Sequence, residues 1–547
     1  MVHTSRTGNK LAGDEQGEET SRVCMNSLSQ NWIVRKPPVR SSQGVVVSQN
    51  IAAARIGAGI LAEGGNAIDA AVAAGFALAA LEPWNSGLGG IGYMVVWQAK
   101  TRSAHVVEFG PIAPRRLDPA AFPLAGTGSS GDLFGWPRVA EDRNVHGPLS
   151  FAVPGQVDGL GLAHERFGKL SWARLLEPAI AEAERGLPVD WFTTLRLATS
   201  ARDVARYPTT ASLYLADGFP PVTLPGAERA HIAMPALAET LRRIAVAGRR
   251  DFYEGAIARK IVADARTLGA VLGADDLAGY AARIVEPLAF RYRGIDLHTA
   301  AGLTAGPTLA RALASIEARN LTGDAPGRDA YCGYADALGE AYRYRFEHMG
   351  EVRDAMAPSC TTHLNVVDGE GNFVALTQTL LSVFGSKVLL PATGILMNNG
   401  VMWFDPRPGR PNSIAPGKRP LSNMCPVVAV TDGAPWLALG ASGGRKIVSA
   451  ITQLLSFLID FRMPLEAAFH QPRIDASGDA EIRVDPQLDS DVQRTLASRF
   501  QTKVAENTVL PVNYACPCAI VVEPASGERV GMADVMSPWS GAAAEGS

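Results

Sequence analysis

Residues 361–380 read TTHLNVVDGEGNFVALTQTL, and this stretch decides how the chain folds. Two runs rich in β-branched residues flank DGEGN at 368–372, a composition typical of a tight turn, so the stretch predicts a β-hairpin centred on residue 370. Opposed residues then have numbers that sum to 740: Val367 faces Phe373, His363 faces Thr377 and Thr361 faces Thr379. Opposed Cβ atoms lie about 5 Å apart, so two threonine hydroxyls are expected to meet at the strand end.

This pair of hydroxyls has two interpretations. Threonine is a good strand residue and Thr-Thr pairs stabilise sheets, so the pair can be purely structural. It can also be part of a catalytic site, with one hydroxyl supporting the other. His363 is expected on the same strand face as Thr361, and we interpret it as a hydrogen-bonded packing residue.

The sequence on both sides of the hairpin predicts an α+β fold. Downstream, PVVAVTDGAPWLALGASGG at 426–444 reads as two strands, and RKIVSAITQLLSFLID at 445–460 as an apolar helix. Upstream, two Ala-rich helices are expected over 51–63 and 66–81, with Asn50 and Asn66 at their starts. The segment 155–350 is mostly helical in pattern. Strands therefore form a central sandwich, and helices form two outer layers.

Composition favours a small-molecule partner. The 547-residue chain has 51 basic and 54 acidic residues and a formal charge of only -3, which gives no reason to expect nucleic acid, a membrane surface or a polyanion as partner. Six cysteines contain no CxxC pair, and no histidine cluster has zinc-ligand spacing. We therefore expect no metal, no cofactor and no disulfide framework.

The N-terminal region predicts a disordered tail over residues 1–40 and a cytoplasmic protein, because it lacks the apolar core of a secretion signal. The longest apolar stretch, residues 67–81, is interrupted by Asp69, so we expect a buried helix and no membrane span.

Residues 87–92 read GLGGIG, a literal match to the dinucleotide-binding fingerprint. That fingerprint requires a strand before it and a helix after it, whereas here a helix precedes and the strand-like YMVVW follows. We therefore expect a tight glycine turn against a neighbouring strand. A long loop rich in Gly, Ser and Pro, residues 120–148, is expected to line or cover a pocket.

Taken as an ordered set, these motifs resemble the γ-glutamyltranspeptidases, which are N-terminal-nucleophile hydrolases. The stretch 361–380 is followed by FGSK, GILMNN, PGKRPLSNMCP and GASGGRKI, and preceded by ILAEGGNAIDAAVA, SGLGGIGYM and AVPGQVDGLGLAHERFGKLSWARLLEPAI. The resemblance implies a four-layer αββα sandwich and self-cleavage between Cys360 and Thr361. A large-subunit segment, 41–360, and a small-subunit segment, 361–547, would then form a heterodimer, and a higher oligomer is left open.

The resemblance also implies a mechanism. The hydroxyl of Thr361 attacks the preceding carbonyl, an N-to-O acyl shift gives an ester, and water frees a new α-amine. With a reference pKa near 7.7–8, that amine can act as a general base, and the acyl-enzyme is passed to water or to an amine acceptor. The implied site residues are Thr379 as support for the nucleophile, Gly443 and Gly444 as the oxyanion hole, and Ser422 and Asn423 in place of two substrate-pocket serines.

Four positions depart from the family pattern. Gly110 stands where an arginine would clamp the glutamyl carboxylate, and Leu381, Gly400 and Trp403 replace polar groups that hold the amino-acid head. Without these groups a zwitterion has few partners, so γ-glutamyl amides are expected to be poor substrates. The sequence leaves open whether Arg115, Arg116 or Arg445 binds the substrate carboxylate in place of the missing arginine.

Several functions fit this pattern. Within the family, the alternatives are a γ-glutamyl hydrolase or transferase, an acylase of the cephalosporin-acylase kind, and an amidohydrolase for a small acid amide such as oxamate. Outside it, GASGG at 440–444 matches the serine-hydrolase elbow, which would make Ser442 the nucleophile, with His470 and either Asp460 or a neighbouring acid as partners. A catalytically dead binding protein is the non-enzymatic alternative.

Overall fold

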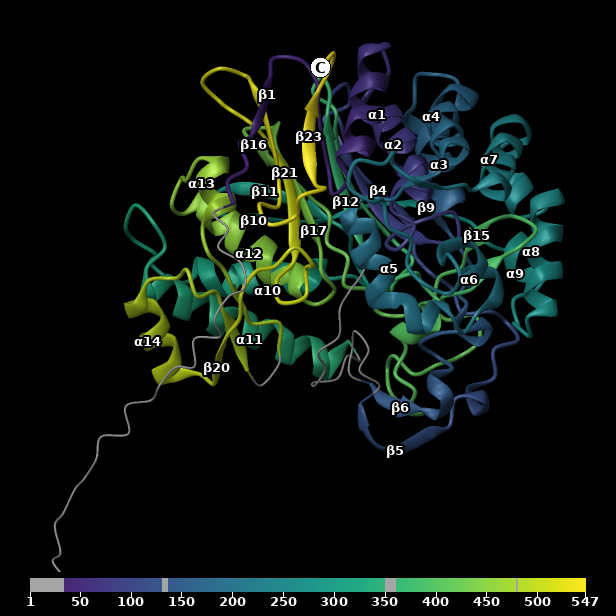
Figure 1. The fold of residues 1–547 in the computed structure, drawn as a ribbon. Helices are drawn as coiled ribbons and strands as arrows, with labels where there is room; N and C mark the ends of the chain where they lie inside the picture. The colour runs from purple at the N-terminus through teal and green to yellow at the C-terminus, as the bar shows by residue number, and fades with distance from the viewer. Residues whose placement is uncertain (1–33, 130–135, 350–360, 479–480) are drawn as a thin grey trace, which may run out of the picture. The chain divides into compact units, whose positions relative to one another are not determined.

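The computed structural model describes residues 34–129, 136–349, 361–478 and 481–547, and Lys36–Ser547 form one compact unit (Figure 1). Two seven-stranded sheets lie at its centre. The first contains, in spatial order, β1 (Val39–Ser41), β22 (Arg529–Ala533), β21 (Cys516–Val522), β17 (Ala434–Ser442), β16 (Val427–Thr431), β11 (Ile295–Thr299) and β10 (Leu288–Tyr292). The second contains β23 (Gly541–Ala544), β2 (Val45–Ser48), β12 (Thr362–Val367), β13 (Phe373–Thr379), β3 (Ile91–Gln98), β4 (Ser103–Phe109) and β9 (Arg283–Val285).

Helices flank both sheets. On the side of the second sheet and its loops are α1 (Ile51–Ala62), α2 (Ala67–Leu81), α3 (Gln156–Phe167), α4 (Trp172–Arg185), α5 (Trp191–Val204), α6 (Pro208–Tyr214), α7 (Pro235–Ala247), α8 (Ala256–Thr267) and α9 (Ala274–Ala278). On the side of the first sheet are α10 (Gly306–Glu317), α11 (Arg328–His348), α12 (Lys446–Ile459), α13 (Leu465–His470) and α14 (Ser490–Arg499). The remaining short strands are β5 (Leu124–Ser129), β6 (Pro137–Val139), β7 (Leu187–Pro188), β8 (His231–Ile232), β14 (Leu389–Leu390), β15 (Ile395–Leu396), β18 (Ile474–Asp475), β19 (Ile482–Val484) and β20 (Thr502–Val504).

Three hydrophobic clusters confirm the four-layer αββα sandwich. One packs α1–α4 against the outer face of the second sheet, and another packs α10–α14 against the outer face of the first. The third lies between the sheets, where inward-facing residues such as Val47, Val95, Val428 and Ile520 meet. Because side chains alternate along a strand, each central strand contributes to two of these clusters, which fixes its register.

The two Ala-rich helices begin as predicted. The side chain of Asn50 accepts hydrogen bonds from the backbone at the start of α1, and Asn66 forms a reciprocal capping box with Asp69 at the start of α2. Both helices are dominated by alanine, so they pack closely against each other and the sheet. Within the described residues, no helix is both long and apolar enough to cross a membrane.

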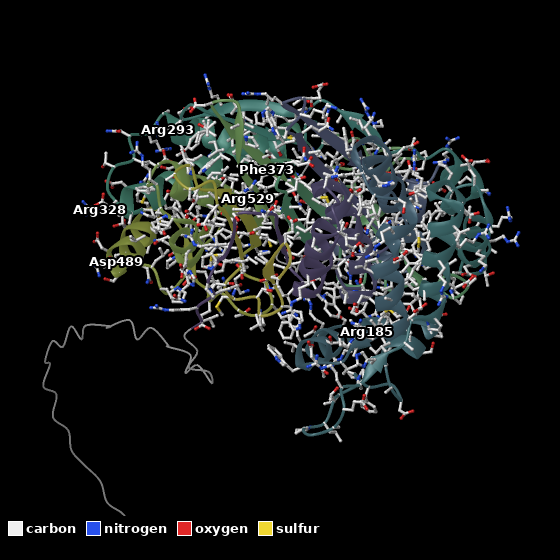
Figure 2. The ribbon with its side chains drawn as sticks, turned by 90° about the horizontal axis from the view of Figure 1, so that it is seen from above. Arg185, Arg293, Arg328, Phe373, Asp489 and Arg529 are labelled. Carbon is white, nitrogen blue, oxygen red and sulfur yellow. The ribbon has the colours of Figure 1, made fainter. Side chains whose placement is uncertain are left out.

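The predicted hairpin is confirmed in its register. His363 pairs with Thr377 and Val367 with Phe373. The side chain of Asp368 accepts hydrogen bonds from the backbone of Glu370 and Asn372 and so closes the turn. Figure 2 shows Phe373, at the start of β13, near Arg529, whose guanidinium donates to the carbonyls of the turn residues 368 and 369.

One prediction of the chain's organisation is corrected, and another is refined. The expected tail over 1–40 is too long: the ammonium of Lys36 donates to the carbonyls of Asp534, Ser537 and Ser540, and β1 pairs with β22. The segment 155–350 is mostly helical as predicted, and it also contains the hairpin of β10 and β11, which completes the first sheet. Both sheets mix strands from before and after residue 361, so the two segments are intertwined.

Candidate active site

The two threonines meet as the hairpin arithmetic predicts. Thr361 lies one residue before β12 and is 6% exposed, and Thr379 ends β13. The Oγ1 of Thr361 lies 3.4 Å from the Oγ1 of Thr379, which also accepts the N–H of Leu381 at 2.7 Å. The Thr379 hydroxyl is therefore held in place and directed at Thr361. The Cys360 side of the predicted cleavage junction lies outside the described residues.

His363 behaves as the predicted packing residue. Its two ring nitrogens lie 2.9 Å from the Thr377 hydroxyl and 3.0 Å from the Asn365 amide oxygen. Burial lowers its pKa to about 4, so the ring is neutral at neutral pH. A Cβ on Gly440 would come within 2.2 Å of this ring, which explains the glycine in β17.

The glycine pair lies at the same end of the sandwich as Thr361. Gly440 faces His363 across the two sheets, and β17 ends two residues later at Ser442, directly before Gly443 and Gly444. Their φ angles are 140° and 59°, and a Cβ on Gly443 would lie 2.8 Å from the Cα of Ala515. Position 443 therefore requires glycine, and the left-handed conformation at 444 favours it.

The carbonyls of Gly443 and Gly444 accept the N–H groups of Lys446 and Ile447 and so begin α12. Among the described residues, neither glycine N–H donates a hydrogen bond. Two backbone donors at the start of a helix can stabilise a developing negative charge.

A side chain that sequence reasoning missed links the two sheets here. The carbonyl of His363 accepts the N–H of Gln49 at 3.4 Å. The Gln49 amide donates to the carbonyl of Cys516 at 2.7 Å and accepts the Ser442 hydroxyl at 2.8 Å. Gln49 thus fixes the start of β12 relative to the end of β17.

A side chain of α11, Arg345, holds the loop that carries Ser422 and Asn423. One nitrogen of the Arg345 guanidinium donates to the carbonyl of Ser422 and to the Oδ1 of Asn423, both at 2.9 Å. The Oγ of Ser422 accepts the N–H of Met424. Sequence reasoning missed Arg345, although it continues the buried stripe of α11 formed by Tyr331, Tyr334, Leu338 and Tyr342.

Two of the four positions that depart from the family pattern, Gly110 and Gly400, leave no room for a larger side chain. A Cβ on Gly110 would lie 2.5 Å from the Tyr93 hydroxyl, and one on Gly400 would lie 2.3 Å from the Cβ of Ala152. Contacts that close do not occur between real side chains, so Tyr93 and Ala152 occupy the space in which an arginine at position 110 and a polar side chain at position 400 would begin.

Apolar side chains replace polar ones at two further positions. Leu381, Met402, Trp403 and Trp136 belong to the cluster between the sheets. Trp136 comes from the long loop over 120–148, so the described part of that loop packs into this cluster, and its role in lining or covering a pocket stays a prediction. Leu381 has a φ of 86°, an uncommon conformation for a non-glycine residue, and its N–H is the one that donates to Thr379.

Arg115, Arg116 and Arg445 are the candidate replacements for the missing carboxylate-binding arginine. None of them lies beside Gly110. Arg115 and Arg116 are exposed, and the Arg115 guanidinium packs at Gly279. Arg445 is buried, with its guanidinium 5.8 Å from the centroid of the Phe346 ring in α11. Arg419 is closer, because its guanidinium donates to the carbonyl of Gly110 at 3.3 Å and lies 3.5 Å from Glu108.

The serine-hydrolase alternative is wrong. Ser442 precedes α12 and Asp460 follows it, so the 14-residue helix separates them by about 21 Å. Asp460 accepts from Ser456 at 2.6 Å and pairs with Arg293. His470 hydrogen-bonds the carbonyl of Glu466 and the backbone N–H of Lys36. No triad forms.

A buried acid, Glu82, lies beside Thr362 at the start of β12. Glu82 follows α2 and accepts the Asn85 amide at 2.7 Å, and Asn85 accepts from Arg196 at 3.2 Å. Burial raises the pKa of Glu82 to about 7, against smaller opposing effects of Thr362 and Arg196. A folded chain therefore keeps a proton on Glu82 at a pH where the unfolded chain has lost it.

We expect Glu82→Gln to change the pH dependence of stability. As pH rises from the unfolded value of 4.5 to about 7, wild type should lose stability relative to the variant, because the folded state binds the extra proton. The difference should approach about 3 kcal/mol. Urea unfolding at pH 5 and pH 8, in a Thr361→Ala background, measures it, and parallel pH profiles of the two proteins would contradict it.

A cavity of about 230 Å³ lies elsewhere, between α6, α7 and the β14–β15 hairpin. None of the predicted site residues lines it. Within the described residues, no group of three or more His, Cys, Asp or Glu side chains is arranged to hold a metal ion.

Comparisons with known proteins agree with this geometry. A family model described as Gamma-glutamyltranspeptidase matches residues 53–359 and 342–544. The Acylase ACY 1 proenzyme of Pseudomonas sp. (strain SE83) is 32% identical over 485 residues, covering 82% of this chain and 85% of that protein. The Glutathione hydrolase proenzyme of Escherichia coli (strain K12) is 29% identical over 562 residues, covering 91% of each. The crystal structure of cephalosporin acylase from Bacillus halodurans shares the fold, with a TM-score of 0.80, 24% identity and coverage of 95% and 99%.

Proposed function

Because this chain belongs to the gamma-glutamyltranspeptidase family and is an amide-cleaving enzyme with the N-terminal-nucleophile fold, we propose that Thr361 is its nucleophile. The supporting observation is the pair of hydroxyls 3.4 Å apart at the end of the hairpin. The chain is made as a precursor, and cleavage before Thr361 yields a two-fragment enzyme. The freed α-amine takes the proton of the Thr361 hydroxyl as that hydroxyl attacks the amide.

The other residues of the site have supporting roles in this proposal. The Thr379 hydroxyl is held by the N–H of Leu381, and it forms a hydrogen bond with the Thr361 hydroxyl. The N–H groups of Gly443 and Gly444 stabilise the oxyanion, and one such donor is worth about 3 kcal/mol in the transition state. The ester on Thr361 then passes its acyl group to water or to an amine.

The acyl group that suits the site carries at most one charge. Tyr93 beside Gly110 occupies the space of the arginine that would pair an α-carboxylate, and Ala152 beside Gly400 that of a polar side chain that would hold the amino-acid head. Leu381 and Trp403 add an apolar wall. We therefore propose an acylase or a small-acid amidohydrolase, and γ-glutamyl transfer is the less favoured candidate. Release of ammonia or amine from a panel of amides, with Thr361→Ala as the blank, tests the assignment.

Thr379→Ala is expected to lower kcat by roughly 10- to 100-fold and leave KM nearly unchanged, because the lost hydrogen bond acts on the nucleophile and not on the substrate. Steady-state kinetics of the processed enzyme measure both constants. Thr377→Val is the matched control, since Thr377 faces the same way on β13 but bonds His363. A rise in KM alone, or equal losses in the two variants, would sink this role for Thr379.

A further inference from the structure

A buried arginine connects two loops at the rim of the site. Arg345 is 1% exposed and lies near the C-terminal end of α11. Its Nη1 donates to the carbonyl of Thr304 at 3.0 Å and to the hydroxyl of Thr308 at 3.2 Å. Its Nη2 donates to Ser422 and Asn423. One guanidinium therefore binds residues 304–308 and residues 422–423 together.

The two loops also pair directly. The N–H of Ser422 donates to the carbonyl of Leu303 at 2.8 Å, and the N–H of Ala305 donates to the carbonyl of Met424 at 3.1 Å. These two bonds alone form a short contact between irregular segments, which is a weak unit. The four bonds of Arg345 reinforce it with a rigid planar fork that a lysine ammonium cannot reproduce.

Arg345 also determines which way the Asn423 amide faces. A guanidinium has only donors, so the amide atom that it contacts must be the oxygen. Among the described residues, the Nδ2 of Asn423 makes no hydrogen bond. The amide therefore offers a donor, and the group that it meets must be an acceptor.

We propose that Arg345 is a positioning residue that holds the Ser422–Asn423 loop and presents the Asn423 NH2 group to a carboxylate or carbonyl oxygen of the acyl group. This inference rests on the proposed function, because it assigns these two residues to the substrate site. The Arg345 contact also joins the two predicted fragments, because Arg345 lies before Thr361 in the chain, and Ser422 and Asn423 lie after it.

The first test needs no catalysis. Hydrogen exchange is measured in the uncut Thr361→Ala chain with and without Arg345→Met. Exchange at the amides of Ser422 and Ala305 should rise at least tenfold, while that of Thr377 in β13 stays unchanged. Arg311→Met, which removes an exposed arginine of α10, is the control and should change neither. Equal protection of Ser422 and Ala305 with and without Arg345 would overturn the proposal.

The second test uses the processed enzyme and glutaryl-p-nitroanilide, whose acyl group ends in a carboxylate. Arg345→Met and Arg345→Lys should raise KM about tenfold or more with kcat within about threefold of wild type. Asn423→Asp keeps an acceptor for Arg345 but removes the donor, so it should raise KM without changing hydrogen exchange. Adding Asn423→Ala to Arg345→Met should cause no further loss, because both act on one contact.

The outcomes distinguish the positioning role of Arg345 from the proposed substrate class. A fall in kcat with unchanged KM, or additive losses in the double variant, overturns the positioning role. A wild-type enzyme that is correctly processed but hydrolyses no anilide contradicts the proposed substrate class, while the exchange experiment still decides whether Arg345 holds the loop.

Discussion

Thr361→Ala is expected to leave a single uncut chain of 57.8 kDa with no measurable amide hydrolysis. The substitution removes the hydroxyl that attacks the preceding carbonyl, and without cleavage no α-amine is available as general base. The loss in turnover should be about 10⁴-fold or more, as is typical for removal of a nucleophile. Thr361→Ser should retain part of both activities, because a hydroxyl and an α-amine survive. Gel electrophoresis and amine release measure the two effects.

Thr362→Val is the matched control for this experiment. Thr362 is the neighbouring buried threonine, but as the next residue of the strand it points away from Thr379 toward Glu82. The variant should therefore still cut itself and turn over substrate. Cleavage of the Thr361→Ala chain at the same bond, or equal failure of both variants, would contradict the assignment of the nucleophile.

Glutaryl- or butyryl-p-nitroanilide is expected to be a better substrate than γ-glutamyl-p-nitroanilide by about 10⁴ in kcat/KM, or roughly 5 kcal/mol in transition-state binding. The three compounds share a leaving group and a four-carbon acyl backbone, and they differ by the stepwise loss of the α-ammonium and then the carboxylate. Each unpaired ion costs several kcal/mol to strip of water. Tyr93 occupies the space of the arginine that would pair the carboxylate, and Ala152 that of a polar side chain at position 400.

The measurement requires enzyme whose processing has been verified, with the Thr361→Ala chain as the blank. A γ-glutamyl substrate within tenfold of the better of the other two would mean that another residue binds its carboxylate. Arg419 would then be the first residue to replace, because its guanidinium already contacts the carbonyl of Gly110.

Local rules predicted the hairpin and the helix starts well. The turn at 368–372 is symmetric and the strand period is two, so the register of β12 and β13 followed from counting. Asn50 and Asn66 mark their helices because an N-cap needs only the next three residues. The glycines of GLGGIG lie as expected, since a Cβ on Gly90 would meet the carbonyl of Thr379 at 2.6 Å.

Long-range contacts explain what sequence reasoning missed. The sequence contains one indication of the β10–β11 hairpin: Arg293-Gly294 is a two-residue turn in which both φ angles are positive. The flanking strands are short, so the pattern was easily missed. Arg345 and Gln49 find their partners many residues away, so no local pattern reveals the contacts. The crowding at Gly110 and Gly400 likewise depends on Tyr93 and Ala152, which come from other elements.

The most direct test of the central claim is the N-terminal sequence of the small fragment in fully active protein. Cleavage before Thr361 predicts two fragments of about 38 and 20 kDa, obtained by scaling 57.8 kDa to 360 and 187 residues, and a small fragment that begins Thr-Thr-His. An intact chain with full activity, or a small fragment that begins at any other residue, would contradict the claim that Thr361 is the nucleophile.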